Sequence, residues 1–202
     1  MDKIANTTPD VTALVLCGGR ARRLGGVDKG LHPVLGRPLV EYVIERIEPQ
    51  VMTLILNANR NIPYYENYGY RVVGDRNRDF DGPLAGVLAG LRSCRTDWLV
   101  SVPCDAPCVA RDLVVKLLDA AQMQDAEIAC AFDGTRLQPT FSLYRTTLTA
   151  PLAEYLDQGE RKIDRFFERR RFVKSDFSGQ SGDFVNLNSD DDVARFTASL
   201  MV

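Results

Sequence analysis

A glycine- and arginine-rich stretch near the N-terminus, LVLCGGRARRLGGVDKGL, spans residues 14–31 and begins with an apolar run. Two glycines at the end of a strand allow the next backbone amides to approach a phosphate closely. Arginines such as Arg23, together with Lys29, add the positive charge that a triphosphate attracts. The stretch therefore predicts a phosphate-binding loop, and the alternative is a flexible turn with solvated arginines.

The spacing within this stretch excludes two familiar phosphate loops. A P-loop carries Gly-Lys-Ser/Thr directly before its helix, whereas Lys29 follows Asp28 and precedes Gly30. The dinucleotide-binding fingerprint requires Gly-x-Gly-x-x-Gly, which these glycines do not match. As an exposed charge on a loop, Lys29 should contribute little to the stability of the fold.

Asp105 lies in the segment PCDAP, directly after the apolar run WLVSVP. A carboxylate at the tip of a buried strand, stiffened by prolines, can hold a hard cation such as Mg2+ against phosphates. The alternative is a helix-capping or turn aspartate. Together with the glycine loop and its lysine, Asp105 predicts nucleotidyl transfer, in which positioning and charge neutralisation supply most of the catalysis.

The elements that must position these residues alternate between strands and helices. Apolar, β-branched runs predict strands, and stripes with helical spacing predict helices. The strands are expected at 12–17, 51–57, 70–73, 98–103 and 127–132, with helices at 39–47, 84–91 and 113–121. This order predicts an α/β fold with a mostly parallel central sheet covered by helices on both faces. Ligands bind beyond the carboxyl ends of the strands in such sheets.

The last third of the chain is less regular. Strands are expected at 138–144, 172–177 and 184–187, with helices at 148–156 and 162–169 and a final helix. No linker or internal repeat divides the chain, so we expect residues 1–202 to form a single domain with one well-buried core.

Composition narrows the class of protein further. The formal net charge of -2 does not favour a nucleic-acid binder with a broad basic face. No apolar stretch approaches the length of a membrane span. Five cysteines without a Cys-x-x-Cys pair, and a single histidine, His32, argue against a zinc site and for reduced thiols. We therefore expect a cytoplasmic protein without membrane or nucleic-acid partners.

Several motifs together resemble one family. LCGGRARRLGGVDKGL, GRPL, NAN, GPLAG, PCD, QPT and FVNLN are similar to the molybdenum cofactor guanylyltransferase family over nearly the whole chain. The Gly-Gly-x-Asp-Lys-Gly element is specific to that family among the nucleotidyltransferases. The resemblance implies a Rossmann-like, three-layer nucleotidyltransferase fold. It also implies transfer of GMP from GTP to molybdopterin, usually carrying molybdenum, with release of pyrophosphate. Cys17 departs from the family, which usually has alanine there.

The resemblance also implies a set of site residues. The nucleotide would contact Leu16, Cys17, Gly18, Gly19, Lys29, Asn57, Asp75, Gly82 and Asp105. Catalysis would fall to Lys29, Asp105 and Arg23, with Mg2+, or Mn2+ in its place, bound by Asp105. The attacking phosphate is already ionised near neutral pH, so no general base is required.

Asn186 and Asn188 lie on the predicted strand 184–187 or directly after it, and an i, i+2 spacing along a strand would turn both to one face. The alternative is a capped turn into the last helix. The family resemblance favours the acceptor side of the cleft. The N-terminal part, to about residue 110, would then bind the nucleotide, and the C-terminal part the acceptor.

Other functions remain open at this stage. A cytidylyltransferase acting on the same acceptor, or a sugar-phosphate nucleotidyltransferase, could share the loop, the lysine and the aspartate. A nucleotide-binding regulatory module is a third alternative, but Lys29 and Asp105 argue against it, since binding alone does not need a metal beside the α-phosphate. The expected partners are GTP, molybdopterin or molybdenum-molybdopterin, and transiently other cofactor-biosynthesis proteins and acceptor apoenzymes.

Overall fold

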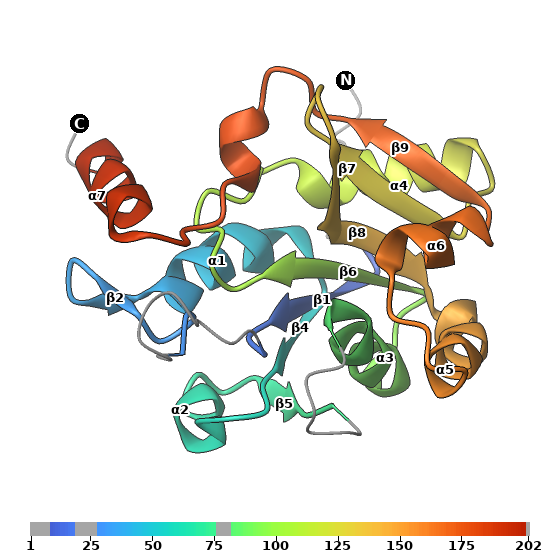
Figure 1. Ribbon diagram of the computed structural model, residues 1–202, viewed down its shortest axis with the longest axis horizontal. Helices are drawn as coiled ribbons and strands as arrows, with labels where there is room; N and C mark the ends of the chain where they lie inside the picture. The colour runs from blue at the N-terminus through green and yellow to red at the C-terminus, as the bar shows by residue number, and fades with distance from the viewer. Residues whose placement is uncertain (1–8, 19–27, 76–81, 201–202) are drawn as a thin grey trace, which may run out of the picture.

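A computed structural model describes residues 9–18, 28–75 and 82–200 of the chain. Its main feature is a seven-stranded sheet of order β5-β4-β1-β6-β8-β7-β9 (Figure 1). The strands are β1 (Val11–Leu16), β4 (Thr53–Asn57), β5 (Arg71–Val73), β6 (Trp98–Pro103), β7 (Ile128–Phe132), β8 (Leu137–Arg145) and β9 (Phe172–Asp176). The first four in chain order are mutually parallel, and β8 runs antiparallel to both β6 and β7. The predicted mostly parallel sheet is confirmed.

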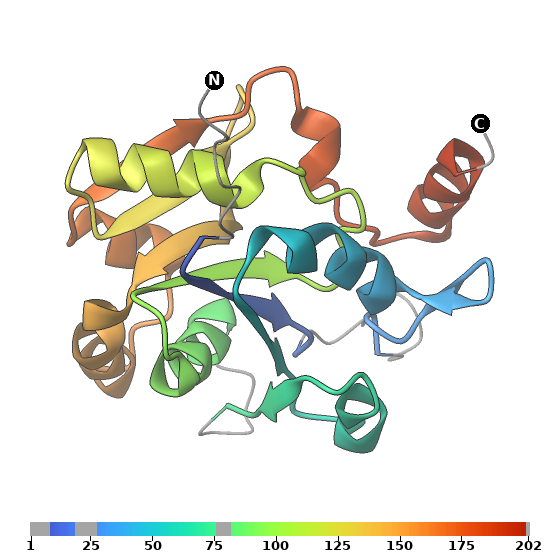
Figure 2. The ribbon, with the colours of Figure 1, turned by 180° about the vertical axis from the view of Figure 1, so that it is seen from behind.

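Helices cover both faces of this sheet. The helices of the described residues are α1 (Leu39–Ile47), α2 (Ile62–Glu66), α3 (Pro83–Ser93), α4 (Leu113–Met123), α5 (Thr149–Asp157), α6 (Ile163–Glu168) and α7 (Asp190–Ser199). Side chains of α1 and α4 pack with Val11, Ala13 and Val15 in one core cluster, and Figure 2 shows these two helices in front of the strands. Side chains of α3, α5 and α6 pack with Leu14 in the other. The three-layer arrangement is therefore confirmed, with alternate residues of β1 facing opposite layers.

Glycines allow α3 to lie unusually close to the sheet. A Cβ on Gly86 would come within 2.4 Å of the side-chain oxygen of Asn57, and one on Gly90 within 2.7 Å of Leu14. The helix begins at Pro83, after Gly82 at a φ of 81° that side chains rarely adopt. The motif GPLAG therefore brings the start of α3 against the end of β4.

A small hairpin packs against the C-terminal helix, α7. The strands β2 (Pro33–Val34) and β3 (Arg37–Pro38) are joined by a two-residue turn in which both φ angles are positive, 50° at Leu35 and 77° at Gly36. Val34 in this hairpin packs with Leu187 and Phe196 in a third apolar cluster. The hairpin at 33–38 and the C-terminal helix are thereby held beside each other.

The prediction of a strand at 184–187 is wrong. Residues Ser181–Phe184 form a 3-10 helix and residues 185–188 have no regular structure. The Phe184 ring packs edge-on against Phe141 and Phe177, with centroids 5.0 and 5.2 Å away, while the backbone amide of Leu187 donates to the carbonyl of Asp105. The apolar residues Phe184 and Leu187 are therefore buried in two separate core clusters, and the segment pairs with none of the described strands of the sheet.

Within the part of the chain described, none of the helices has the length and apolar character needed to cross a bilayer.

Candidate active site

Several of the predicted site residues in the described ranges gather at the carboxyl edge of the parallel strands. Backbone pairing continues one residue beyond the strands, since Cys17 N donates to Asn57 O at 2.8 Å and Cys104 N donates to Leu16 O at 3.1 Å. This pairing sets the residues after β1, β4 and β6 side by side. Asp105 follows Cys104 directly and therefore lies at the same edge.

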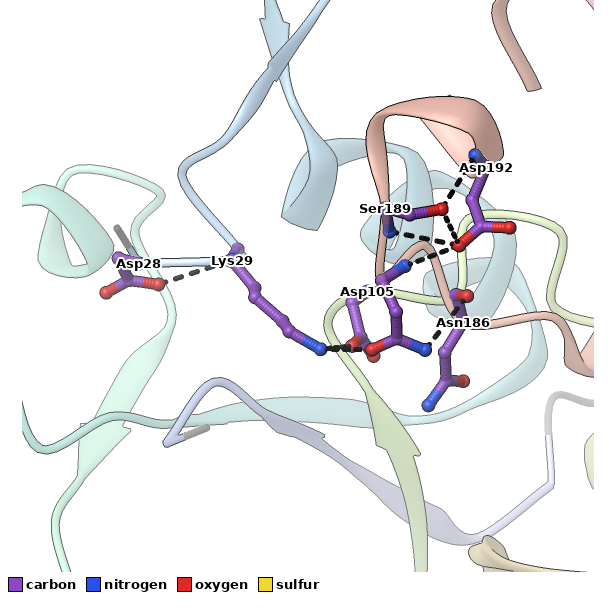
Figure 3. Close-up of polar contacts among 8 residues, drawn as sticks. Asp28, Lys29, Asp105, Asn186, Ser189 and Asp192 are labelled. Carbon is purple, nitrogen blue, oxygen red and sulfur yellow. Dashed lines mark hydrogen bonds and ion pairs between the residues drawn. The ribbon is translucent and has the colours of Figure 1, made fainter. Parts of the chain in front are cut away.

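Lys29 is the centre of the polar contacts at this edge. Its Nζ donates to Oδ2 of Asp105 at 2.8 Å, beside which it lies in Figure 3, and it also donates to Oδ1 of Asn188 at 2.5 Å. The two charged side chains are only 19% and 9% exposed. The expectation that Lys29 is an exposed loop charge is therefore wrong, because the lysine folds back onto Asp105. Residues 76 and 159 positions away in the sequence converge on one ammonium group.

The C-terminal segment reaches the site through Asn188. Its side-chain Nδ2 donates to the backbone carbonyl of Asn186 at 3.2 Å, which turns Oδ1 toward Lys29. The expected arrangement, with Asn186 and Asn188 facing one side of a strand, is wrong, since these residues lie in an irregular segment before α7. Of the pair, Asn188 contributes its side-chain amide to the cluster and Asn186 contributes its backbone carbonyl.

A capping box at the start of α7 fixes the segment that carries Asn188. The Ser189 hydroxyl caps the amide of Asp192, and the Asp192 carboxylate accepts from the Ser189 amide and hydroxyl and from the backbone amide of Asn188. Bonds from the Ser189 hydroxyl and the Asn188 amide, with Arg195 nearby, lower the pKa of Asp192 to about 2. The sequence Ser-x-x-Asp at 189–192 is the recognisable signal for this cap, and the alternative expectation of a capped turn into the last helix is confirmed.

A second polar network joins the ends of β4 and β5. The Asp75 carboxylate accepts from Asn57 Nδ2 at 2.9 Å and from Asn59 Nδ2 at 2.7 Å. The backbone amide of Asp75 donates to Asn59 Oδ1. Asn57 also donates to Val73 O. Two asparagines and an aspartate from neighbouring strand ends therefore form one rigid unit. The structure thus brings Asn57 and Asp75 together, as the sequence predicted for strand ends.

The backbone at Gly18 lies against this network. A Cβ on Gly18 would approach Asn59 Nδ2 to 3.4 Å and Asn57 Oδ1 to 3.7 Å, which is ordinary contact distance. Together with Gly86 opposite Asn57, small residues from the glycine loop and from α3 enclose the asparagine. Of the other predicted residues, Gly19 and Arg23 lie outside the described residues.

Cys17 is buried at the end of β1, with its thiol donating to the Val15 carbonyl at 3.6 Å. The neighbouring thiol of Cys104 has its pKa raised well above the ordinary value by a hydrogen bond with Cys17 and by burial. All five cysteines are free thiols. Burial limits the access of oxidants to the Cys17 thiol.

Metal chemistry at this edge would rest on oxygen donors. Within the described ranges, His, Cys, Asp and Glu side chains form no group of three that could hold a metal ion. Mg2+ is commonly held by one or two carboxylates together with substrate phosphates. Asp105 Oδ2 and Asn188 Oδ1 are hard oxygens that already converge on one cationic atom, the Nζ of Lys29. The donor set therefore fits a magnesium ion that is shared with a phosphate ligand.

The fold and the site together define a class of protein. The fold has three layers, and glycines follow the first strand of its sheet. A lysine pairs with an aspartate at the carboxyl edge of that sheet. These features together are the arrangement of a nucleotidyltransferase. Comparison with known proteins gives the family: the chain belongs to the MobA-like NTP transferase family, whose domain model matches residues 13–173.

Individual relatives cover nearly the whole chain. The molybdenum cofactor guanylyltransferase of Shewanella sp. (strain ANA-3) is 42% identical over 190 residues, which cover 94% of this chain and 96% of the relative. That of Shewanella pealeana is 43% identical over 179 residues, with 89% and 90% covered. The crystal structure of molybdopterin-guanine dinucleotide biosynthesis protein A from Archaeoglobus fulgidus superposes with a TM-score of 0.79 at 22% identity, covering 94% of this chain and 98% of its own. At that identity, the likeness to the crystal structure supports the shared fold.

Proposed function

We propose that this protein transfers GMP from GTP to molybdopterin, with or without bound molybdenum, and releases pyrophosphate. The observation that carries the proposal is the contact of Lys29 with both Asp105 and Asn188 at the carboxyl edge of β6. Relatives named molybdenum cofactor guanylyltransferase, 42% identical over 94% of the chain, supply the substrate pair.

The reaction requires mainly that the two substrates are positioned and that the charge on the triphosphate is neutralised. An oxygen of the terminal phosphate of the acceptor attacks the α-phosphorus of GTP, and the bond from that phosphorus to the bridging oxygen breaks, so pyrophosphate leaves with the electron pair. Phosphate monoesters are mostly ionised at neutral pH, because their second pKa is about 6, so no general base is required. Lys29, with Arg23 as a second cation, offsets the charge that develops on the triphosphate.

Asp105 is the residue we assign to Mg2+, with Mn2+ as a substitute. Its carboxylate is largely buried and faces the same ammonium group as Asn188. A divalent cation at this position would neutralise charge on the phosphate oxygens and help align them. Asp105 would contribute one anionic oxygen, and the triphosphate would contribute the others.

We assign the nucleotide to the side of the edge where β1, β4 and β5 end. The residues proposed to contact it are Leu16, Cys17, Gly18, Gly19, Asn57, Asp75 and Gly82, together with Lys29 and Asp105. Residues 1–202 would then act as one domain, with the nucleotide bound by the part up to about residue 110 and the acceptor by the rest. The bond from Lys29 to Asn188 would join the two parts.

Nucleotide choice gives the first prediction. GTP is expected to be used at least roughly tenfold better than ATP or CTP, because a site that hydrogen-bonds one base edge leaves groups unpaired with another, at about 1 kcal/mol or more for each. Incubation with each NTP, Mg2+ and molybdopterin, followed by release and identification of the dinucleotide, measures this. Equal turnover with CTP would assign a cytidylyltransferase, and transfer only to sugar phosphates would replace the proposed acceptor.

The acceptor side gives the second prediction. Asn188→Ala removes the amide that Lys29 contacts, so transfer to molybdopterin should fall by about tenfold or more, since a hydrogen bond to a charged group is worth about 1.5–3 kcal/mol. Asn186→Ala keeps its backbone carbonyl and is the matched control, expected to stay within about threefold of wild type. Acceptor-saturation kinetics beside a GTP titration by calorimetry separate the two substrates. If Asn188→Ala weakens GTP binding alone, Asn188 belongs to the nucleotide side.

We also propose that the reaction takes place in the cytoplasm, with transient contacts to other molybdenum cofactor biosynthesis proteins and to acceptor apoenzymes.

A further inference from the structure

Asp28 precedes Lys29 directly, yet its side chain points the opposite way, into the protein (Figure 3). The residue is 6% exposed. Its Oδ1 accepts from the backbone amide of Gly30 at 3.1 Å and from the hydroxyl of Tyr65 at 2.6 Å, and its Oδ2 accepts from Asn61 Nδ2 at 3.0 Å. A buried carboxylate is thus bound by neutral donors from the loop and from the segment around α2, while the neighbouring lysine points to Asp105.

Tyr65 reaches Asp28 because a glycine stands between them. Tyr65 is fully buried, and a Cβ on Gly30 would come within 2.5 Å of its hydroxyl oxygen. Burial, with smaller contributions from the thiols of Cys17 and Cys104 and from Asp28, raises the pKa of Tyr65 far above its ordinary value. The hydroxyl therefore stays protonated and remains a donor to the carboxylate.

The backbone on each side of Lys29 is held by a different helix. On one side, Asp28 is tied to Asn61, the N-terminal flanking residue of α2, which has a left-handed conformation with φ 51°, and to Tyr65 within α2. On the other side, the carbonyl of Gly30 accepts from the amide of Val40 in α1 at 2.9 Å. The four-carbon side chain of Lys29 is flexible, so these backbone anchors determine where its ammonium group can reach.

We propose that Asp28, Asn61 and Tyr65 are positioning residues for the proposed nucleotidyl transfer and that they act through Lys29. The proposal rests on the function assigned above, in which Lys29 faces the triphosphate. Small displacements of a group that stabilises developing charge are costly, and a misplacement of about 1 Å can lower a rate on the order of a hundredfold. The hydroxyl of Tyr65 and the amide of Asn61 both donate to Asp28, and through it they hold the loop that carries the cation.

The test is a double-mutant cycle with Lys29. Tyr65→Phe keeps the ring and removes the donor, and we expect it to lower kcat about fivefold or more and to weaken GTP binding measured without acceptor. In a Lys29→Ala background the same change should have almost no further effect. Tyr68→Phe is the matched control, because its hydroxyl also donates to a carboxylate, that of Glu41 at 3.0 Å, and it should leave kcat and GTP affinity unchanged.

Two further variants are needed. One tests the proposal even if Tyr65→Phe does not fold, and the other tests whether Asp28 acts through its hydrogen bonds or through its charge. Asn61→Gly removes the side-chain donor and suits the left-handed backbone, so it should fold and lower kcat in the same Lys29-dependent way. Asp28→Asn can keep Oδ1 as the acceptor for Gly30 and Tyr65 if the Asn61 amide turns over, so it should restore most of the rate lost in Asp28→Ala.

The outcomes distinguish this inference from the function on which it rests. If Lys29→Ala lowers turnover but the Tyr65 and Lys29 effects simply add, Tyr65 and Asn61 stabilise the fold without positioning Lys29, and the inference is wrong. If Lys29→Ala itself leaves turnover and GTP affinity at wild-type values, the function assigned to Lys29 fails, and the inference fails with it.

Discussion

Lys29→Ala is expected to remove most of the turnover, on the order of a hundredfold or more, which is the usual cost of losing one group that stabilises developing charge. Lys29 Nζ is the cation that both Asp105 and Asn188 bind. Its loss should lower kcat together with kcat/KM, because the charge it offsets grows as pyrophosphate leaves. Steady-state kinetics with GTP and molybdopterin measure this, and a mutant with wild-type rates would exclude the assignment.

The same substitution should also cost stability, because it leaves the largely buried Asp105 carboxylate without its ion-pair partner. We expect a loss of about 1–3 kcal/mol in the free energy of unfolding, reduced where water reaches the carboxylate. Lys29→Gln is the matched control, since its amide can still donate to a carboxylate while the charge is gone. It should unfold closer to wild type in denaturant titrations and still lack most of the turnover.

Apolar periodicity was enough to predict most of the fold. The stripes at 39–47, 84–91 and 113–121 correspond to α1, α3 and α4, and the first five predicted strands are present with ends shifted by up to two residues. Such stripes report burial against a sheet, which is what holds these elements in place. The same logic failed at 184–187, where Phe184 and Leu187 are buried in separate clusters, so alternation there did not report a strand.

The site was predictable where residues end strands and not where they meet through space. Asn57, Asp75 and Asp105 follow strands, and the parallel sheet brings such residues to one edge. Asp28 and Tyr65 are 37 positions apart, and no local pattern indicates that they touch. The approach of Asn188 to Lys29 depends on a cap, an apolar cluster and the backbone of Asp105 acting together. Only the cap carries a sequence signal.

Asp105→Asn is expected to lower turnover on the order of a hundredfold while preserving the shape of the side chain. The amide oxygen can still accept from Lys29, so the geometry at the end of β6 should persist, but the anionic oxygen that would hold Mg2+ is lost. Raising the Mg2+ concentration should restore the rate in part at best. A metal titration of kcat/KM for wild type and mutant, with each folded state checked by thermal unfolding, measures the effect.

Asp112→Asn provides the matched control for this change. Asp112, which flanks the N-terminus of α4, also pairs with a lysine, Lys116 of that helix, at 2.8 Å, and this pair is separate from the one between Lys29 and Asp105. Because that pair is more than a third exposed at each side chain, its loss should hardly change stability, and turnover and metal dependence should equal those of wild type. Full activity of the wild-type protein in EDTA without added metal would contradict the role given to Asp105, since its carboxylate would then contribute only the ion pair with Lys29.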